Sequence, residues 1–255
     1  MATVAAQPVV RAPHTQHWRS QHTLALGGIL VAILAVGCLM PWAAGRHDFQ
    51  YARLAAWVMT LALFLALALV VGHGITGLYR GAFVDDRNKL SLSRVQMFLW
   101  TALVLSAYLS AGLANVGLGA AEPLAISVPQ TLLQAMGLST ISLVAAPAVL
   151  HGIKKDNVTA NASPAGSSWT DLVQGDEVAT ENGVDLGKLQ LLFVTIVLTL
   201  GYAVVLGHAY VDHGLTTVKA LPSIDTAFIV MLGISHGGYL AKKAVPRADV
   251  PQGGA

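Results

Sequence analysis

The chain has 255 residues, of which 55% are hydrophobic and only 11% are charged, and its mean hydropathy is +0.62. A soluble domain of this size usually carries about 25% charged residues, so the composition excludes a water-soluble globule and predicts an integral protein of the lipid bilayer. The 15 Lys and Arg residues nearly balance the 13 Asp and Glu residues, so no basic surface indicates nucleic-acid binding.

Uncharged stretches between flanking charges predict an all-α bundle of six membrane-spanning helices, because about 20 apolar residues cross a bilayer. The first apolar run is too long for a signal-peptide h-region and lacks a suitable cleavage site, so we expect it to be retained. The last run is the shortest and the weakest as a full crossing. The predicted helices cover residues 23–44, 54–78, 94–117, 128–152, 188–210 and 224–241.

The distribution of positive charge predicts the orientation of these helices. Every Lys and Arg except Arg46, Arg53 and Lys219 falls on one side of the predicted bundle. Cationic side chains resist translocation, so this side is expected to be cytoplasmic, with both termini inside. Trp42 and Trp57 then fall at the outer interface, where aromatic rings are favoured. The expected location is a cytoplasmic (inner) membrane.

The predicted organisation has one sizeable soluble segment, the loop 153–187. Its residues 161–168 are typical of a flexible linker. Residues 169–177 predict a short interfacial helix, a partner contact or an ordered loop lying on the bundle. The full division is a tail 1–22, a helix pair 23–80, a membrane segment 81–152, the loop 153–187, a second membrane segment 188–245 and a tail 246–255.

The two membrane segments 81–152 and 188–245 resemble each other and predict an internal duplication. Each copy crosses the bilayer twice and enters from the same side, so the repeats are expected to be parallel rather than inverted. The matches fall on the less common residue types, in the same order. They are Leu92/Leu186, Gln96/Gln190, Thr101/Thr195, Tyr108/Tyr202, Ser127/Ser223, Gly137/Gly233 and Ser139/Ser235.

Several matched residues predict helix starts. Ser93 with Gln96 has the spacing of a capping box, in which the two side chains satisfy free N–H groups of the first turn. The same spacing recurs at Ser127 with Gln130, and in weaker form at Gly187 with Gln190. Ser223 is expected to cap the sixth helix.

Five segments resemble an uncharacterised family of bacterial multi-pass membrane proteins, over about residues 81–245. No activity is attached to such proteins, so the resemblance implies a bacterial inner-membrane setting and no mechanism. The segments are 86–100 (DRNKLSLSRVQMFLW), 136–139 (MGLS), 169–172 (WTDL), 175–177 (GDE) and 232–240 (LGISHGGYL).

Polar residues within the apolar stretches are the candidate functional groups, because polar atoms in hydrocarbon are costly. No Asp, Glu, Lys or Arg lies in the core of a predicted helix, which argues against a carboxylate proton relay or an arginine voltage sensor. His236 either lines a hydrated path or hydrogen-bonds across a helix interface. Ser106, Ser110 and Ala114 predict a packing face. The other candidates are His73, Asn115, Ser139, Thr140 and His208.

Metal, cofactor and catalytic sites are not indicated. Cys38 is the only cysteine, so neither an intrachain disulfide nor a thiolate metal site is expected. His208, Asp212 and His213 with His47 and Asp48 have side chains suited to a metal site, but no closely spaced histidine pair supports one. No catalytic motif is present, so we expect no enzyme.

Two hypotheses for function remain. In the first, the protein is a small channel or permease, as a homo-oligomer or through its repeats, with a path at the Gly-x-Ser segments. Alternatively, Gly137 and Gly233 simply remove bulk so that a neighbouring backbone approaches closely. The second hypothesis is a non-catalytic anchor or scaffold that binds a cytoplasmic protein through the loop 153–187. The path residues are Gly137, Ser139, Thr140, Gly233, Ser235 and His236.

Overall fold

A computed structural model describes residues 17–47, 51–153, 158–177, 182–212 and 216–244. Its six long helices confirm the all-helical prediction, and in these ranges β-structure is limited to isolated bridges. The helices are α1 (Ser20–His47), α2 (Ala52–Thr76), α3 (Leu92–Gly117), α4 (Gln130–Ile153), α5 (Leu186–Asp212) and α6 (Thr226–Ala244). Short 3₁₀ turns η1 (Tyr79–Phe83), η2 (Pro164–Gly166) and η3 (Trp169–Leu172) lie in the connections.

Five of these helices, α1 to α5, are long and apolar enough to cross a membrane, which indicates an integral membrane protein. The shorter α6 has only 19 residues and is not among the five. Its sequence carries Ser235, His236, Lys242 and Lys243 within that length, so its apolar run is brief. Six crossings therefore stay a prediction.

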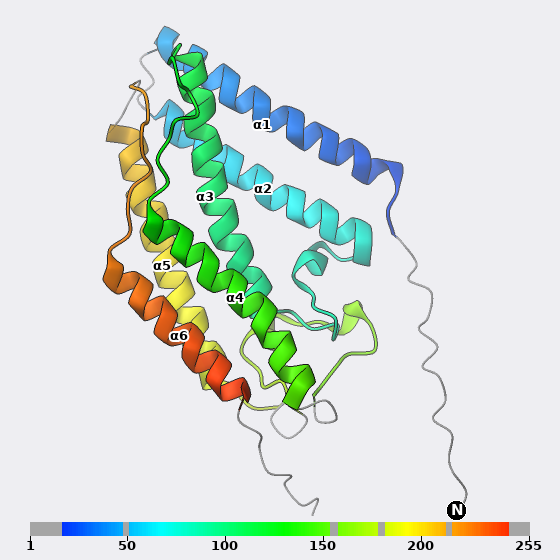
Figure 1. Cartoon of the computed structure of the whole chain (residues 1–255). Coiled ribbons are helices and arrows are strands. Elements are labelled where there is room, and N and C mark those ends of the chain that lie inside the picture. Colours follow the sequence, from blue (N-terminus) through cyan, green and yellow to red (C-terminus); the bar gives the residue numbers. More distant parts are fainter. Residues whose placement is uncertain (1–16, 48–50, 154–157, 178–181, 213–215, 245–255) are drawn as a thin grey trace, which may run out of the picture.

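Helices α3, α4, α5 and α6 form a bundle, and α1 and α2 lie side by side against it through α3 (Figure 1). Within the bundle α4 packs against α3 and α6, and α5 packs against α6 and α3. Trp100 of α3, Leu206 of α5 and Leu232 of α6 belong to its main core and are at most 1% exposed. A second core lies nearer the start of α3 and includes Leu90 and Leu191.

The helix starts differ from the predicted capping boxes. The side chain of Ser91, rather than Ser93, accepts the backbone N–H of Arg94, so α3 begins at Leu92. Ser93 is buried instead, and Gln96 points to Thr195 of α5. The capping-box spacing favours Ser93, but the packing of α3 buries this serine and leaves Ser91 as the cap.

The predicted caps of α5 and α6 are also replaced. Asp185 accepts the backbone N–H groups of Gly187 and Lys188 at the start of α5. Asp225 accepts that of Ala227 at the start of α6. A carboxylate suits this place because it accepts free N–H groups and faces the positive end of the helix dipole. Gln190 and Ser223, which were predicted for these roles, are exposed. The capping box predicted at Ser127 and Gln130 for α4 stays a prediction.

Two tyrosines at matched positions of the proposed repeats make matching bonds. Tyr108 of α3 donates to the carbonyl of Leu124 at 2.8 Å, and Tyr202 of α5 donates to that of Pro222 at 3.2 Å. Both carbonyls lie in the connection to the next helix. The two connections also pair with each other at Ser127 and Ala220. This correspondence agrees with a duplication, which stays a prediction.

Candidate functional site

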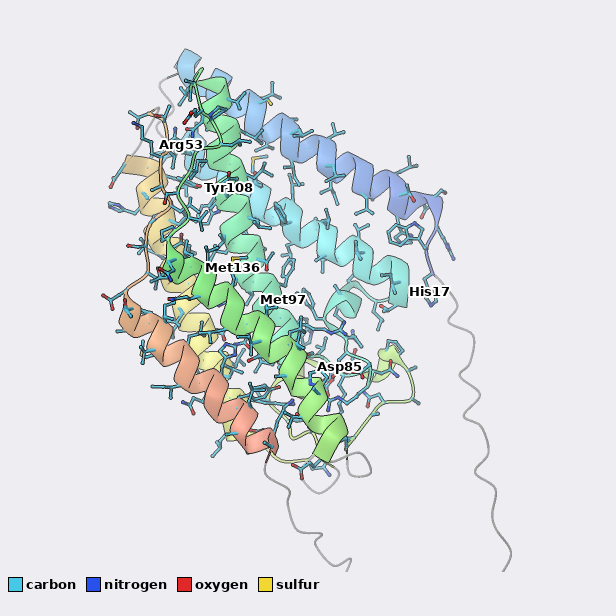
Figure 2. The ribbon with its side chains drawn as sticks, in the orientation of Figure 1. His17, Arg53, Asp85, Met97, Tyr108 and Met136 are labelled. Carbon is cyan, nitrogen blue, oxygen red and sulfur yellow. The ribbon has the colours of Figure 1, made fainter. Side chains whose placement is uncertain are left out.

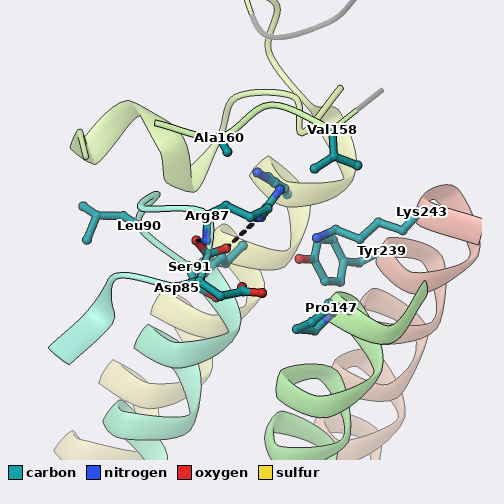
Figure 3. A pocket seen from close by; sticks show the side chains of 13 residues that line it. Asp85, Arg87, Leu90, Ser91, Pro147, Val158, Ala160, Tyr239 and Lys243 are labelled. Atoms are coloured by element: carbon teal, nitrogen blue, oxygen red, sulfur yellow. Dashed lines mark hydrogen bonds and ion pairs between the residues drawn. The ribbon is translucent and has the colours of Figure 1, made fainter. Parts of the chain in front are cut away.

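The ends of four helices and two loops surround a pocket at one end of the bundle, which we call the pocket end. Asp85 lies at this end and Arg53 near the opposite end (Figure 2). The pocket has a volume of about 190 Å³ and lies between the loop 85–91, α4, α6 and the segment 158–160 (Figure 3). Its lining comprises Asp85, Asp86, Arg87, Leu90, Ser91, Leu92, Ala146, Pro147, Val158, Ala160, Lys188, Tyr239 and Lys243.

The loop that leads into α3 is held in a tight turn by Asp85. One carboxylate oxygen of Asp85 accepts the backbone N–H groups of Arg87 and Lys89, and the other accepts the Arg87 guanidinium at 2.8 and 3.0 Å. Asn88 has a φ of 59°, in the left-handed region that asparagine tolerates better than most residues. The turn therefore presents the Arg87 side chain to the pocket.

The segment 158–177 is attached to this loop and does not hang free. Asn88 and Asn161 exchange side-chain-to-carbonyl hydrogen bonds of 2.8 and 2.9 Å. The buried Asp171 accepts the backbone N–H of Leu90 at 3.0 Å and that of Ser168 at 2.8 Å. The expectation of an ordered loop lying on the bundle is met for these described residues.

Asp176 lies at the centre of a buried ion cluster, which we call the Asp176 cluster. Its carboxylate contacts the side-chain nitrogens of Arg87 at 3.0 Å, Lys188 at 2.9 Å and Lys243 at 2.9 Å. These cations come from the loop before α3, the first turn of α5 and the last turn of α6. The Asp176 and Lys188 side chains are each 6% exposed and that of Lys243 is 8% exposed. One carboxylate thus joins three elements.

The ionisation of Asp176 makes the stability of the pocket end depend on pH. Burial alone would raise the pKa of its carboxyl, but Lys243, Lys188 and Arg87 outweigh burial and hold that pKa well below its usual range. The folded chain therefore binds fewer protons here than the unfolded chain, whose aspartates titrate near pH ~3.9.

We expect the Tm of the purified protein in detergent to fall as the pH drops below about 5, and to fall further through pH ~4. In acid the stabilisation that the ionised Asp176 carboxylate gives the folded state is progressively lost. Scanning calorimetry across this range measures the effect. The variant Asp176→Asn should have a flatter acid limb than the wild type. An unchanged slope in the variant would contradict the assignment.

Below the pocket, three helices place buried polar side chains one turn deeper than the residues that line it. Leu92 is followed by Gln96 in α3, Ala146 is preceded by Ser142 in α4, and Tyr239 is preceded by His236 in α6. We call this set, with its nearest buried polar neighbours, the polar seam. Its members are Gln96, Ser139, Ser142, Thr195, Ser235 and His236, each at most 3% exposed.

The polar seam contains two hydrogen-bonded pairs and three atoms without a partner among the described residues. Ser142 bonds the Nδ1 of His236 across the α4–α6 interface, and Gln96 donates to Thr195 between α3 and α5. The unpartnered atoms are Gln96 Oε1, Ser235 Oγ and His236 Nε2. Buried polar atoms without a protein partner are usually satisfied by water, so the seam is suited to holding water.

The Gly-x-Ser residues divide between the seam and the surface. Ser139 and Ser235 are buried between helices, whereas Thr140 is exposed on the outside of the bundle and bonds the carbonyl of Met136 in its own helix. A Cβ atom added at Gly137 or Gly233 would meet nothing within 4 Å. The predicted close backbone approach at these glycines is therefore wrong, and they lie where side chains of neighbouring helices do not reach.

The remaining polar candidates have local roles. Asn115 donates to the carbonyls of Pro123 and Val218 and accepts the N–H of Val218, so it joins two connections. His73 contacts the His22 ring at 2.9 Å. Ser106, on the buried stripe with Ser110 and Ala114, accepts the indole N–H of Trp57.

The described residues do not support the metal site considered from sequence. His208 pairs with Asp212 at 2.9 Å in an exposed position, and no group of three or more ligand-type residues gathers among the described residues. Asp48, His213 and the side chain of His47 lie outside the described residues.

No protein-family model, curated protein or solved structure matches the chain. The site therefore rests on its own geometry. Sequence reasoning missed the Asp176 cluster, because it used Arg87, Lys188 and Lys243 only as indicators of orientation. One signal was present in the sequence: the segments 86–100, 169–172, 175–177 and 232–240, singled out there, all contribute residues to the pocket end.

Proposed function

We propose that this integral membrane protein is a small-solute permease of a bacterial inner membrane, with the pocket as its cytoplasmic solute site and the polar seam as the start of its path. The observation that carries the proposal is the continuity of polar groups from the pocket into the bundle. Gln96, Ser142 and His236 each lie one helical turn below a pocket-lining residue. A residue three or four positions away lies on the same helix face.

An apolar layer closes the seam at its deep end. Leu132, Ala135 and Leu232 are fully buried there, and Trp100 is 1% exposed. A site open on one side and closed by a packed layer on the other is the arrangement that a carrier requires between transport steps. Passage then requires a movement that separates α4 from α6 at this layer.

Access of water to the seam tests the path directly. In a background where Cys38 is replaced by serine, Ser235→Cys and Thr140→Cys are matched variants, because one side chain lies in the seam and the other outside the bundle. We expect a small membrane-impermeant thiol reagent to modify Ser235→Cys at least ten times faster, since thiolates form in water rather than in lipid. Equal rates would refute the hydrated seam. Solute flux into proteoliposomes then tests transport itself.

The second candidate, an anchor or scaffold, is favoured by one observation. Trp169 is 61% exposed on η3, and a large exposed aromatic side chain is typical of a protein contact or a membrane interface. Deleting residues 160–180 would also remove Asp171 and Asp176, so loss of a partner would not be interpretable. Trp169→Ser is the sharper test: a scaffold should lose its co-purifying partner while Tm stays within about 2 °C of the wild type.

A further inference from the structure

We infer that the pocket binds the oxyanion group of a small, singly charged solute, a carboxylate or a phosphate monoanion. This inference rests on the proposed function, because it names the class of solute that the pocket admits. It follows from the hydrogen-bonding capacity of the charged groups around the pocket, from the start of α3 and from the size of the space.

Hydrogen-bond donors exceed acceptors around the pocket. Each lysine ammonium carries three N–H donors. Lys188 contacts two described acceptors, Asp176 and the carbonyl of Asp171. Lys243 contacts Asp176 at 2.9 Å and lies over the ring of Tyr239, 4.5 Å from its centre. With respect to the described residues, both ammonium groups therefore retain capacity for one further acceptor.

The carboxylates of the pocket end, Asp85, Asp86 and Asp176, already have partners. The two oxygens of Asp85 accept four hydrogen bonds, from the side chain of Arg87 and from two backbone N–H groups, which fills their lone pairs. The two carboxylate oxygens of Asp176 contact three cationic side chains. Arg87 donates three hydrogen bonds of the five that a guanidinium offers. A solute that supplies oxygen acceptors complements this surplus, whereas an ammonium group does not.

The start of α3 adds a second, independent feature. Ser91, its N-cap, and Leu92, its first residue, both line the pocket, so the positive end of the helix dipole faces the space where the solute would lie. Anions bind at such helix starts. Here the helix has 26 residues and points to the same pocket as the buried Lys188 and Lys243.

Charge and volume limit the size of the anion. The carboxylates of Asp85, Asp86 and Asp176 balance the three cations in formal charge, and Asp86 is exposed at the pocket. A multiply charged anion would therefore bring more uncompensated charge into the pocket than a singly charged one. A space of about 190 Å³ corresponds to roughly six water molecules at ~30 Å³ each. The apolar wall of Leu92, Pro147 and Tyr239 suits a short carbon chain such as that of propionate.

The test uses the full-length protein in nanodiscs, with Tm measured against acetate, propionate and inorganic phosphate at constant ionic strength. We expect saturable stabilisation by at least one of these anions and none by chloride or ammonium. Lys243→Gln should weaken the apparent affinity at least tenfold, because it removes a donor from the pocket. Its control, Lys242→Gln, removes the neighbouring lysine, which pairs with Asp185 outside the pocket lining, and should stay within twofold.

If Lys243→Gln does not fold, Ala160→Glu provides the second variant. Ala160 lines the pocket and is exposed, so glutamate adds a negative charge there without disturbing the core, and Ala160→Gln is its neutral control.

A phosphate effect that persists with free phosphate in phosphatidylcholine nanodiscs identifies a free solute. An effect seen only with phosphatidylglycerol identifies a lipid headgroup.

Absence of saturable stabilisation by all three anions, or equal affinity in Lys243→Gln and Lys242→Gln, would overturn the inference. Saturable binding without flux in proteoliposomes would instead leave the oxyanion site standing and refute the permease.

Discussion

Replacing Asp176 by alanine is expected to lower the free energy of unfolding by about 3–5 kcal/mol, the usual cost of removing one partner from a buried ion pair. The loss is large because Arg87, Lys188 and Lys243 all contact this carboxylate. Without it, the two buried lysines repel each other in a region with little solvent. Unfolding by titration with a denaturing detergent, followed by circular dichroism, measures the difference.

Asp185→Asn is the matched control for this prediction. Asp185 pairs with Lys242 near the same helix ends, but that lysine side chain is 36% exposed, and such pairs contribute about 0–1 kcal/mol. Asp185 also caps α5, and asparagine retains an accepting oxygen for that role. Equal losses in the two variants would show that the Asp176 cluster is not a structural centre.

Trp100→Ala should lower the free energy of unfolding by about 3–5 kcal/mol, because it removes the largest fully buried side chain among the described residues and leaves a cavity. Trp100 is 1% exposed and lies 6.3 Å, between ring centres, from Tyr202 of α5. In a membrane the transfer of apolar surface from lipid contributes little, so the cost comes from lost packing contacts.

The exposed Trp169 provides the comparison for Trp100. Trp169 is 61% exposed, and its replacement by alanine should change the free energy of unfolding by no more than about 0.5 kcal/mol. Both variants can be measured in one detergent titration. A small effect at Trp100 would mean that the α3–α5 contact is loosely packed or that the bundle closes around the cavity.

The apolar helices could be predicted from sequence because each is a continuous run of apolar residues that is long enough to cross a bilayer. The predicted third helix, 94–117, differs from Leu92–Gly117 only at its start. The starts were less predictable, since the capping-box spacing favours Ser93, whereas burial of Ser93 in the fold leaves Ser91 as the cap.

The ion cluster could not be predicted in the same way. Arg87 and Asp176 are 89 positions apart, and no periodicity relates them, because their pairing depends on how the segment 158–177 crosses the helix ends. The same limit applied to His236. Its sequence context permitted a hydrated path or an interface bond, and the structure shows an interface bond to Ser142 at one ring nitrogen while the other has no described partner.

The order of the cluster along the chain has a consequence for biosynthesis. Arg87 precedes Asp176, whereas Lys188 and Lys243 follow it, at the two ends of the last helical hairpin. While the ribosome is still making α5 and α6, the aspartate has only one of its cations available. The pocket is therefore completed last, after the final helix has been made and has packed against the bundle, and a chain stalled before Lys243 would expose an incomplete site to cellular proteases.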